Sequence, residues 1–261
     1  MAKAKQKFGS LHTAEKLDRL AAYLKAFTTA LKNQPFELAY LDAFAGTGEI
    51  QVSERPLSLI EGAEANAFIK GSVQRALKVD PPFHSFTFIE LRAGKAADLR
   101  DILTAEYPST NSTVLVGDAN DQILEFISSK NWRRTRGVVF LDPFGSQVRW
   151  ETLERLAATQ AIDLWYLFPA GLSVLRQIGR DGKIDAEHRA SVDRILGTDD
   201  WPNALVRKSA TTDLFGELDE QVEYRANAEQ ITQYMRERMG TIFRGGVNPN
   251  SLPLGSRNVH M

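Results

Sequence analysis

The chain has 261 residues, of which 43% are hydrophobic and 25% are charged, and its formal net charge is -1. This size and composition predict one large globular domain that buries a core without a disulfide or metal. The absence of cysteine excludes disulfides, thiolate zinc sites, iron–sulfur clusters and cysteine nucleophiles. No apolar run approaches the roughly 20 residues of a membrane span, and no signal-like core follows the basic N-terminus, so we expect a cytoplasmic protein.

Short apolar segments alternate with amphipathic ones along most of the chain. Helical spacing of apolar residues predicts a first helix that is capped by Thr13 and ends at Leu31. Strands are then expected at residues 37–42, 86–90, 114–118, 138–142 and 164–168, and helices at residues 122–128, 150–158, 186–196 and 227–239. The alternation predicts an α/β fold with a doubly wound, mostly parallel, Rossmann-like sheet that helices cover on both faces.

The chain divides by composition into four segments. We expect an N-terminal helix packed on the core, a Rossmann-like core, a charged helical insertion or lid, and a last core helix with a sixth strand, over residues 1–35, 36–178, 179–226 and 227–261. The sixth strand is expected to begin at Thr241. Residues 258–261 have the pattern of an opening strand, so we expect the chain to be shortened at its C-terminus.

Four of the expected strands present a carboxylate at their carboxyl end. The four acids are Asp42, Glu90, Asp118 and Asp142. Ligands of open parallel sheets bind beyond the carboxyl ends of the strands. We therefore expect these acids to surround one ligand-binding site.

The first of these acids precedes a Gly-rich turn, Asp42-Ala-Phe44-Ala-Gly46-Thr-Gly48. Glycines let a backbone turn sharply and pass close to a ligand. A dinucleotide site requires a third glycine where this chain has Gln51, and the Gly-Lys-Ser/Thr ending of a phosphate-binding P-loop is absent. A sulfonium cofactor such as S-adenosyl-L-methionine has no phosphate and suits an acid before the turn. A plain strand–turn junction is the alternative.

Two further strand ends supply candidate contacts to the same cofactor. Glu90 is placed to accept hydrogen bonds from both ribose hydroxyls, and Asp118 with Asn120 could bind the adenine amino group. Each of these residues could instead cap the following helix. Three acids at three successive strand ends favour a cofactor site over three unrelated caps.

The sequence Asp142-Pro143-Phe144-Gly145 follows the fourth strand. Asp142 and the Pro143 carbonyl can accept hydrogen bonds from an exocyclic amine, while Phe144 stacks on a planar base. Orientation of the amine lone pair is most of what methyl transfer requires. A β-turn with proline at its second position is the alternative.

Other chemistry receives little support from the sequence. The four histidines are scattered and have no metal-ligand spacing, and no Gly-x-Ser-x-Gly motif is present, so we expect neither a metal centre nor a serine hydrolase. The basic cluster at residues 132–136 could bind phosphates, but it precedes a strand and is expected at the edge opposite the ligand site. Net charge near zero gives no indication of the substrate.

At these motifs the sequence resembles the three-Cys-motif partner proteins, a methyltransferase-like family of bacteria and their mobile elements. The likeness spans roughly residues 13–200 and rests on Tyr40-Leu-Asp-Ala-Phe-Ala-Gly46, Gly71-Ser-Val-Gln-Arg75-Ala-Leu, Gly117-Asp-Ala-Asn120, Phe140-Leu-Asp-Pro-Phe-Gly145 with Trp150, and Asp163 through Phe168-Pro169. The resemblance implies a class I methyltransferase fold and a partner protein that resembles radical S-adenosylmethionine enzymes. The block Asp142-Pro-Phe-Gly145 is also similar to the corresponding motif of tRNA guanine-N2 dimethyltransferases.

The sequence therefore leads to two main hypotheses. The first is an S-adenosylmethionine-dependent enzyme that methylates an exocyclic amine of a nucleic-acid base. The second is a catalytically silent partner protein that binds the cofactor or a three-Cys-motif neighbour. A nicotinamide-dependent enzyme is a third hypothesis, which Gln51 disfavours.

Overall fold

The computed structural model describes residues 8–45, 71–209, 222–249, 253–254 and 259–260. The chain divides into two compact units, one formed by Met1–Asp142 with Thr159–Tyr166 and the other by Pro143–Ala158 with Leu167–Met261. The four segment boundaries expected from composition stay predictions. No helix within the described ranges is long and apolar enough to cross a membrane.

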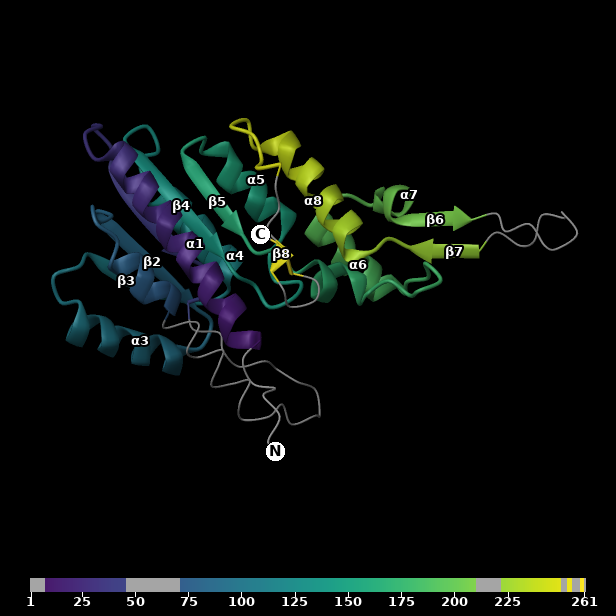
Figure 1. Ribbon diagram of the computed structural model, residues 1–261, viewed down its shortest axis with the longest axis horizontal. Helices are drawn as coiled ribbons and strands as arrows, with labels where there is room; N and C mark the ends of the chain where they lie inside the picture. Colours follow the sequence, from purple (N-terminus) through teal and green to yellow (C-terminus); the bar gives the residue numbers. More distant parts are fainter. Residues whose placement is uncertain (1–7, 46–70, 210–221, 250–252, 255–258, 261) are drawn as a thin grey trace, which may run out of the picture. The chain divides into compact units, whose positions relative to one another are not determined.

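The first unit contains the central sheet, which Figure 1 shows beneath helix α1. Its elements are α1 (Phe8–Leu31), β1 (Glu37–Asp42), β2 (Ser85–Glu90), α3 (Ala93–Glu106), β3 (Ser112–Val116), α4 (Ala119–Ser128), β4 (Thr135–Leu141) and β5 (Ile162–Tyr166). Residues 71–77 are also helical. The five strands are all parallel and lie in the order β3-β2-β1-β4-β5, which is the order of class I methyltransferases. The predicted fold class is confirmed.

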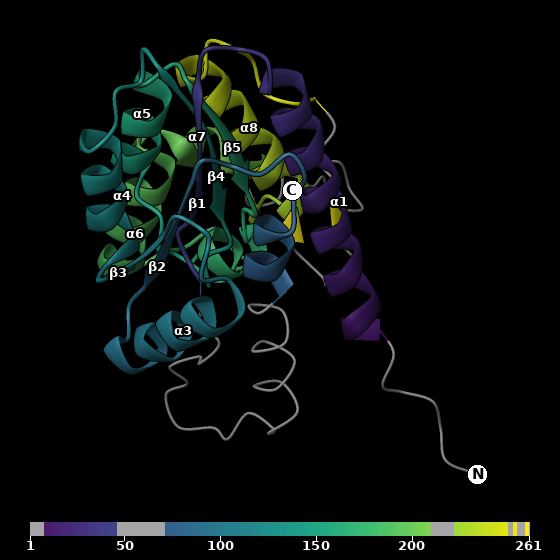
Figure 2. The same cartoon turned by 90° about the vertical axis from the view of Figure 1, so that its left-hand side faces the viewer.

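Helices cover both faces of this sheet, as Figure 2 shows for α1 and α4. On the α1 face, Tyr40 of β1 contacts Phe86 and Phe88 of β2 and also Phe83, which precedes β2, and these rings form an aromatic layer. Phe27 of α1 stacks on Phe83 with ring centroids 5.9 Å apart. Because strand side chains alternate between faces, a slip of one residue would move these rings to the opposite face of the sheet and break up the layer, so the packing fixes the register of β1 against β2.

The second unit is mostly helical and has two short antiparallel ribbons. Its elements are α5 (Trp150–Ala158), a π-helical turn η1 (Gly171–Leu175), α6 (Ala186–Leu196), α7 (Trp201–Leu205), β6 (Val206–Ser209), β7 (Val222–Arg225), α8 (Ala228–Ile242), β8 (Pro253–Leu254) and β9 (Val259–His260). The helix expected at residues 186–196 is confirmed with the same ends. The pairing of β6 with β7 was not predicted, because two strands of four residues give too short a pattern.

Two details of the sequence analysis are wrong, and a third is observed. No sixth strand begins at Thr241, because α8 continues to Ile242 and the N–H of Phe243 still bonds to the carbonyl of Met239. Residues 259–260 do form a strand, β9, which pairs antiparallel with β8. Thr13 does not cap α1, since that helix already begins at Phe8.

Helix α6 ends at a glycine that the packing of the second unit requires. Gly197 is the C-cap of α6 and has a left-handed backbone with φ of 65°. A Cβ added at Gly197 would overlap the side chain of Trp150 at the start of α5. The end of α6 therefore lies directly against α5 only because residue 197 has no side chain.

This contact gives a stability prediction with a matched control. Gly197→Ala should lower the free energy of unfolding by about 2–5 kcal/mol, since it adds backbone strain and overpacks Trp150. Gly240→Ala, in α8, meets no atom within 4 Å and should instead stabilise by about 0.5–1 kcal/mol. Urea unfolding of both variants tests the expectation, and equal stabilities would show that the close packing at Gly197 is not needed.

Candidate functional site

Parallel pairing brings two buried acids to neighbouring strand ends. Asp42 closes β1 and lies in register with Phe88 of β2 and Phe140 of β4. Glu90 closes β2, two residues beyond Phe88, and lies in register with Val116 of β3. Both acids are 1% exposed, although a buried carboxylate is costly unless it is hydrogen-bonded or paired.

Asp42 is held by hydrogen bonds to both of its carboxylate oxygens. Its Oδ1 accepts from the backbone N–H of Phe44 at 3.2 Å, and its Oδ2 accepts from the hydroxyl of Ser72 at 2.9 Å. Burial nevertheless raises its pKa to about 7, although these two hydrogen bonds oppose the shift. Each oxygen has a second lone pair, so the group can still accept from a ligand.

Asp142 follows β4 and acts electrostatically on Asp42. Its negative charge contributes to the raised pKa of Asp42, so the two carboxyl groups interact within the first unit. Asp142 is only partly buried. The structure thus brings together the acids after β1 and β4, as the sequence predicts for strands whose carboxyl ends share one edge.

Glu90 differs from Asp42 because one of its oxygens is unsatisfied. Its Oε1 accepts from the backbone N–H of Arg92 at 2.9 Å. Its Oε2 is buried and has no hydrogen-bond partner among the described residues. Burial raises the pKa of Glu90, and the Arg92 N–H and the charge of Lys95 partly offset this shift. An unsatisfied buried acceptor is rare in native proteins and suits a ligand that donates hydrogen bonds.

The third strand end carries a helix cap. Asp118 is the N-cap of α4, and its Oδ1 accepts from the backbone N–H and the side-chain amide of Asn120, both at 3.0 Å. Asp118 is exposed and Asn120 is 3% exposed. The capping role that the sequence left open for Asp118 is confirmed, and its position beside Glu90 follows from the bond between the Gly117 N–H and the Glu90 carbonyl.

The turn after β1 is only partly described. The Phe44 side chain is 6% exposed and is therefore part of the core, while its N–H orients Asp42. Gly46 and Gly48, which the sequence assigns to the cofactor, lie outside the described residues.

Pro143 and Phe144 belong to the second unit. Pro143 is buried, whereas the Phe144 ring is 48% exposed and its backbone N–H donates to Oε1 of Gln147 at 2.6 Å. Gly145 follows with φ of 75°, a conformation that favours glycine. The chain therefore fixes the Phe144 backbone while leaving its aromatic face accessible.

Three residues of this edge were missed by the sequence analysis. Ser72 donates to Asp42 across thirty residues of sequence, and nothing in a lone serine indicates such a contact. Leu91 and Val116 are 55% and 39% exposed, and each follows or closes a strand beside Glu90. Leu91 could have been identified from the sequence, because it is a large apolar residue directly after the strand-end acid Glu90.

Other groups lie away from this edge. The basic cluster at residues 132–136 precedes and enters β4 at its amino end, the edge opposite Asp142. Among the described residues, no three His, Cys, Asp or Glu side chains are grouped to hold a metal ion.

The sequence matches no protein-family model and no curated protein. Among solved structures, the chain is similar to "Putative methyltransferase yhhF from Escherichia coli", with 15% sequence identity and a TM-score of 0.31. The match covers 78% of this chain and 86% of that chain. The fold class rests on the observed parallel strand order and not on this similarity.

Proposed function

We propose that this chain binds S-adenosyl-L-methionine at the carboxyl ends of β1, β2 and β3 and transfers its methyl group to an exocyclic amine of a nucleic-acid base. The observation that carries the proposal is the pair of acids Asp42 and Glu90, each 1% exposed at neighbouring strand ends. Oε2 of Glu90, which lacks a partner among the described residues, is the acceptor that a ribose would satisfy.

The residues around Glu90 suit the nucleoside part of this cofactor. A carboxylate that accepts two hydroxyl hydrogen bonds is a common way to hold a ribose. Leu91 and Val116 expose apolar surface beside Glu90, which suits the faces of an adenine ring. Asp118 and Asn120 follow β3 and offer polar groups to the adenine edge.

Asp42 suits the cationic part of the cofactor. When bound, the cofactor supplies an electrophilic methyl group on a positively charged sulfur. An ionised Asp42 at the start of the turn favours positive charge nearby, and Ser72 and the Phe44 N–H keep its carboxylate oriented. Gly46 and Gly48 are proposed to allow the close approach of the backbone.

The acceptor motif Asp142-Pro143-Phe144 supplies the remaining groups. The Asp142 carboxylate and the Pro143 carbonyl would accept the amine hydrogens and so orient the nitrogen lone pair toward the methyl group, whose bond to sulfur would break as the bond to nitrogen forms. The proton that the amine loses goes to Asp142 or to water. The exposed ring of Phe144 provides the stacking surface for a planar base.

Glu90→Gln tests the ribose contact. The amide keeps the size of the side chain but removes its charge and one acceptor, so cofactor affinity should fall about 10- to 100-fold. Isothermal titration calorimetry with S-adenosyl-L-methionine measures the change. Asp101→Asn, which neutralises an exposed acid of α3, is the matched control and should bind as the wild type does. Equal affinity of the two variants would refute the assignment of Glu90.

The raised pKa of Asp42 predicts a pH dependence of cofactor binding. The carboxylate form favours the cationic cofactor and becomes dominant as the pH rises through about 7, so affinity should increase roughly tenfold between about pH 6 and about pH 8. The cofactor's own amino group titrates in a similar range. The Asp42→Asn variant lacks the Asp42 carboxyl, so the pH dependence that it keeps measures the contribution of the cofactor. A wild-type profile that matches the Asp42→Asn profile would contradict the role of Asp42.

Asp142→Ala separates transfer from binding. Transfer of a radiolabelled methyl group to nucleic acid should fall about 100- to 10,000-fold because the amine is no longer oriented. Cofactor affinity at pH 7 should stay the same or rise up to about twofold, since loss of the Asp142 charge lowers the pKa of Asp42. Full transfer by the variant would exclude Asp142 from the acceptor site.

Cofactor binding without transfer to any nucleic acid would favour the second hypothesis, a partner protein that holds the cofactor for a three-Cys-motif neighbour. Co-purification of that neighbour with the wild-type chain, but not with Glu90→Gln, would then link cofactor binding to the partnership.

A further inference from the structure

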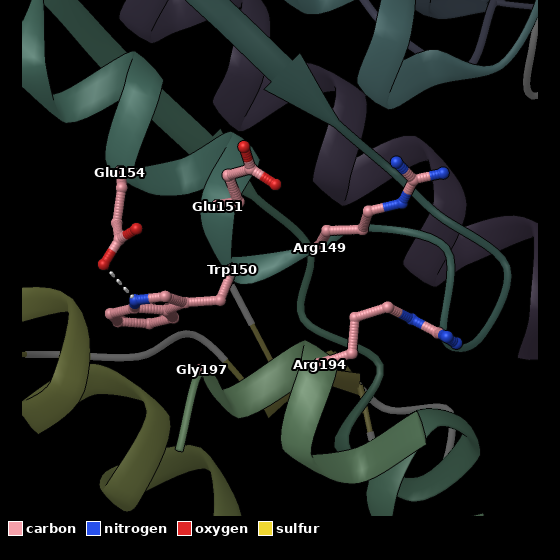
Figure 3. Close-up of a pocket in the computed structure, with 6 residues that line it drawn as sticks. All are labelled: Arg149, Trp150, Glu151, Glu154, Arg194 and Gly197. Atoms are coloured by element: carbon pink, nitrogen blue, oxygen red, sulfur yellow. Dashed lines mark hydrogen bonds between the residues drawn. The ribbon is translucent and has the colours of Figure 1, made fainter. Parts of the chain in front are cut away.

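A groove in the second unit lies between the start of α5 and the end of α6 (Figure 3). Its volume is about 580 Å³, and its lining residues are Arg149, Trp150, Glu151, Glu154, Arg194 and Gly197. The groove is open to solvent, because four of these six side chains are charged and exposed. The methyl-transfer chemistry proposed above uses none of these residues.

Trp150 forms a fixed wall of the groove. It is 5% exposed, and its indole N–H donates to Oε1 of Glu154 at 2.8 Å. Gly197 packs against the side chain of Trp150, and the guanidinium of Arg238 lies 4.7 Å from the Trp150 ring centroid. The groove is therefore preformed rather than assembled by mobile side chains.

The two arginines that line the groove extend away from Trp150 in the same direction (Figure 3). Arg194 is exposed and makes no hydrogen bond or ion pair with any described residue, so its guanidinium donors are available to a ligand. The negative end of α6 is already neutralised, since Arg238 donates to the carbonyls of Leu196 and Gly197 at 3.1 and 2.9 Å. The positive end of α5 adds to the attraction for an anion.

We propose that this groove binds a phosphate group of the nucleic-acid backbone, through Arg149 and Arg194. Two guanidinium groups on one side of a groove match the several acceptor oxygens of a phosphate. The inference rests on the proposed function, since it places the backbone of the same substrate whose base stacks on Phe144.

Chain connectivity keeps the groove within reach of the acceptor motif. Phe144 and Arg149 belong to the same unit and are five residues apart, so their Cα atoms are separated by at most about 18 Å. A phosphate a few nucleotides from the stacked base can therefore reach Arg149 and Arg194. Phosphate contacts of this kind fix the register of a nucleic acid and leave base selection to other groups.

Glu151 repels an anion in the groove, so its replacement should change phosphate affinity in the opposite direction to the replacement of Arg194. It is exposed, lines the groove and carries a negative charge beside Arg149. Glu154 repels the anion less, because its carboxylate lies over the Trp150 indole, away from the guanidinium groups of the two arginines (Figure 3). Removal of the Glu151 charge should therefore strengthen phosphate binding, whereas removal of Arg194 should weaken it.

The experiment is fluorescence anisotropy of the full chain with labelled single-stranded oligonucleotides of about 16 nucleotides, in a DNA arm and an RNA arm of the same sequence. Arg194→Ala should weaken binding about five- to tenfold and reduce the slope of log affinity against log salt by about 0.7. Arg194→Lys should recover part of the loss. Arg155→Ala removes an exposed arginine of the same helix α5 that does not line the groove, and it should bind within about twofold of the wild type.

Glu151→Gln should bind about two- to threefold more tightly than the wild type. The proposal is overturned if neither oligonucleotide binds, or if Arg194→Ala keeps the wild-type affinity and salt slope. Calorimetry with S-adenosyl-L-methionine on the same variants separates the two proposals. Cofactor binding without Arg194-dependent oligonucleotide binding refutes the groove alone, whereas Arg194-dependent binding without methyl transfer refutes the proposed chemistry alone.

Discussion

Backbone hydrogen bonds from β1 to β2 on one side and to β4 on the other decide where the candidate site forms. They align Asp42 with Phe88 and Phe140, and they place Glu90 two residues further along the neighbouring strand. The aromatic layer around Tyr40 makes any other register costly, because a slip of one residue would move its rings to the opposite face of the sheet and break their contacts. The packing of apolar side chains thus fixes the strand register, and the register places Asp42 and Glu90 in the interior, where carboxylates are otherwise disfavoured.

Burial disfavours the charged form of Asp42, and this cost appears as a raised pKa. Its pKa of about 7 means that burial disfavours the charge more than Ser72 and the Phe44 N–H favour it. A positive ligand would reverse this balance by supplying the charge partner that the described residues lack. The same reasoning explains why Asp142 matters to Asp42, since the negative charge of Asp142 also raises the pKa of Asp42.

The sequence predicted most of the sheet because the strands are short, apolar runs and four of the five are closed or followed by an acid. It predicted the edge at which Asp42, Glu90 and Asp142 meet for the same reason, since parallel strands share their carboxyl edge. It did not predict the hydrogen bond from Ser72 or the groove at Arg194, because contacts between distant segments depend on helix packing, which local periodicity does not encode. The strand expected at Thr241 was wrong because β-branched and aromatic residues also occur in the last turn of a helix, here α8.

A comparison of acids within the chain distinguishes a site from a structural role. Asp118 and Asp185 cap helices and are exposed, and Asp193 accepts from the Trp201 indole at 2.6 Å. Each of these carboxylates has a structural partner that accounts for its position. Glu90 is 1% exposed and leaves one oxygen without a partner in the described part of the chain. Such an oxygen costs roughly 1–3 kcal/mol, a cost that proteins usually carry where a ligand repays it.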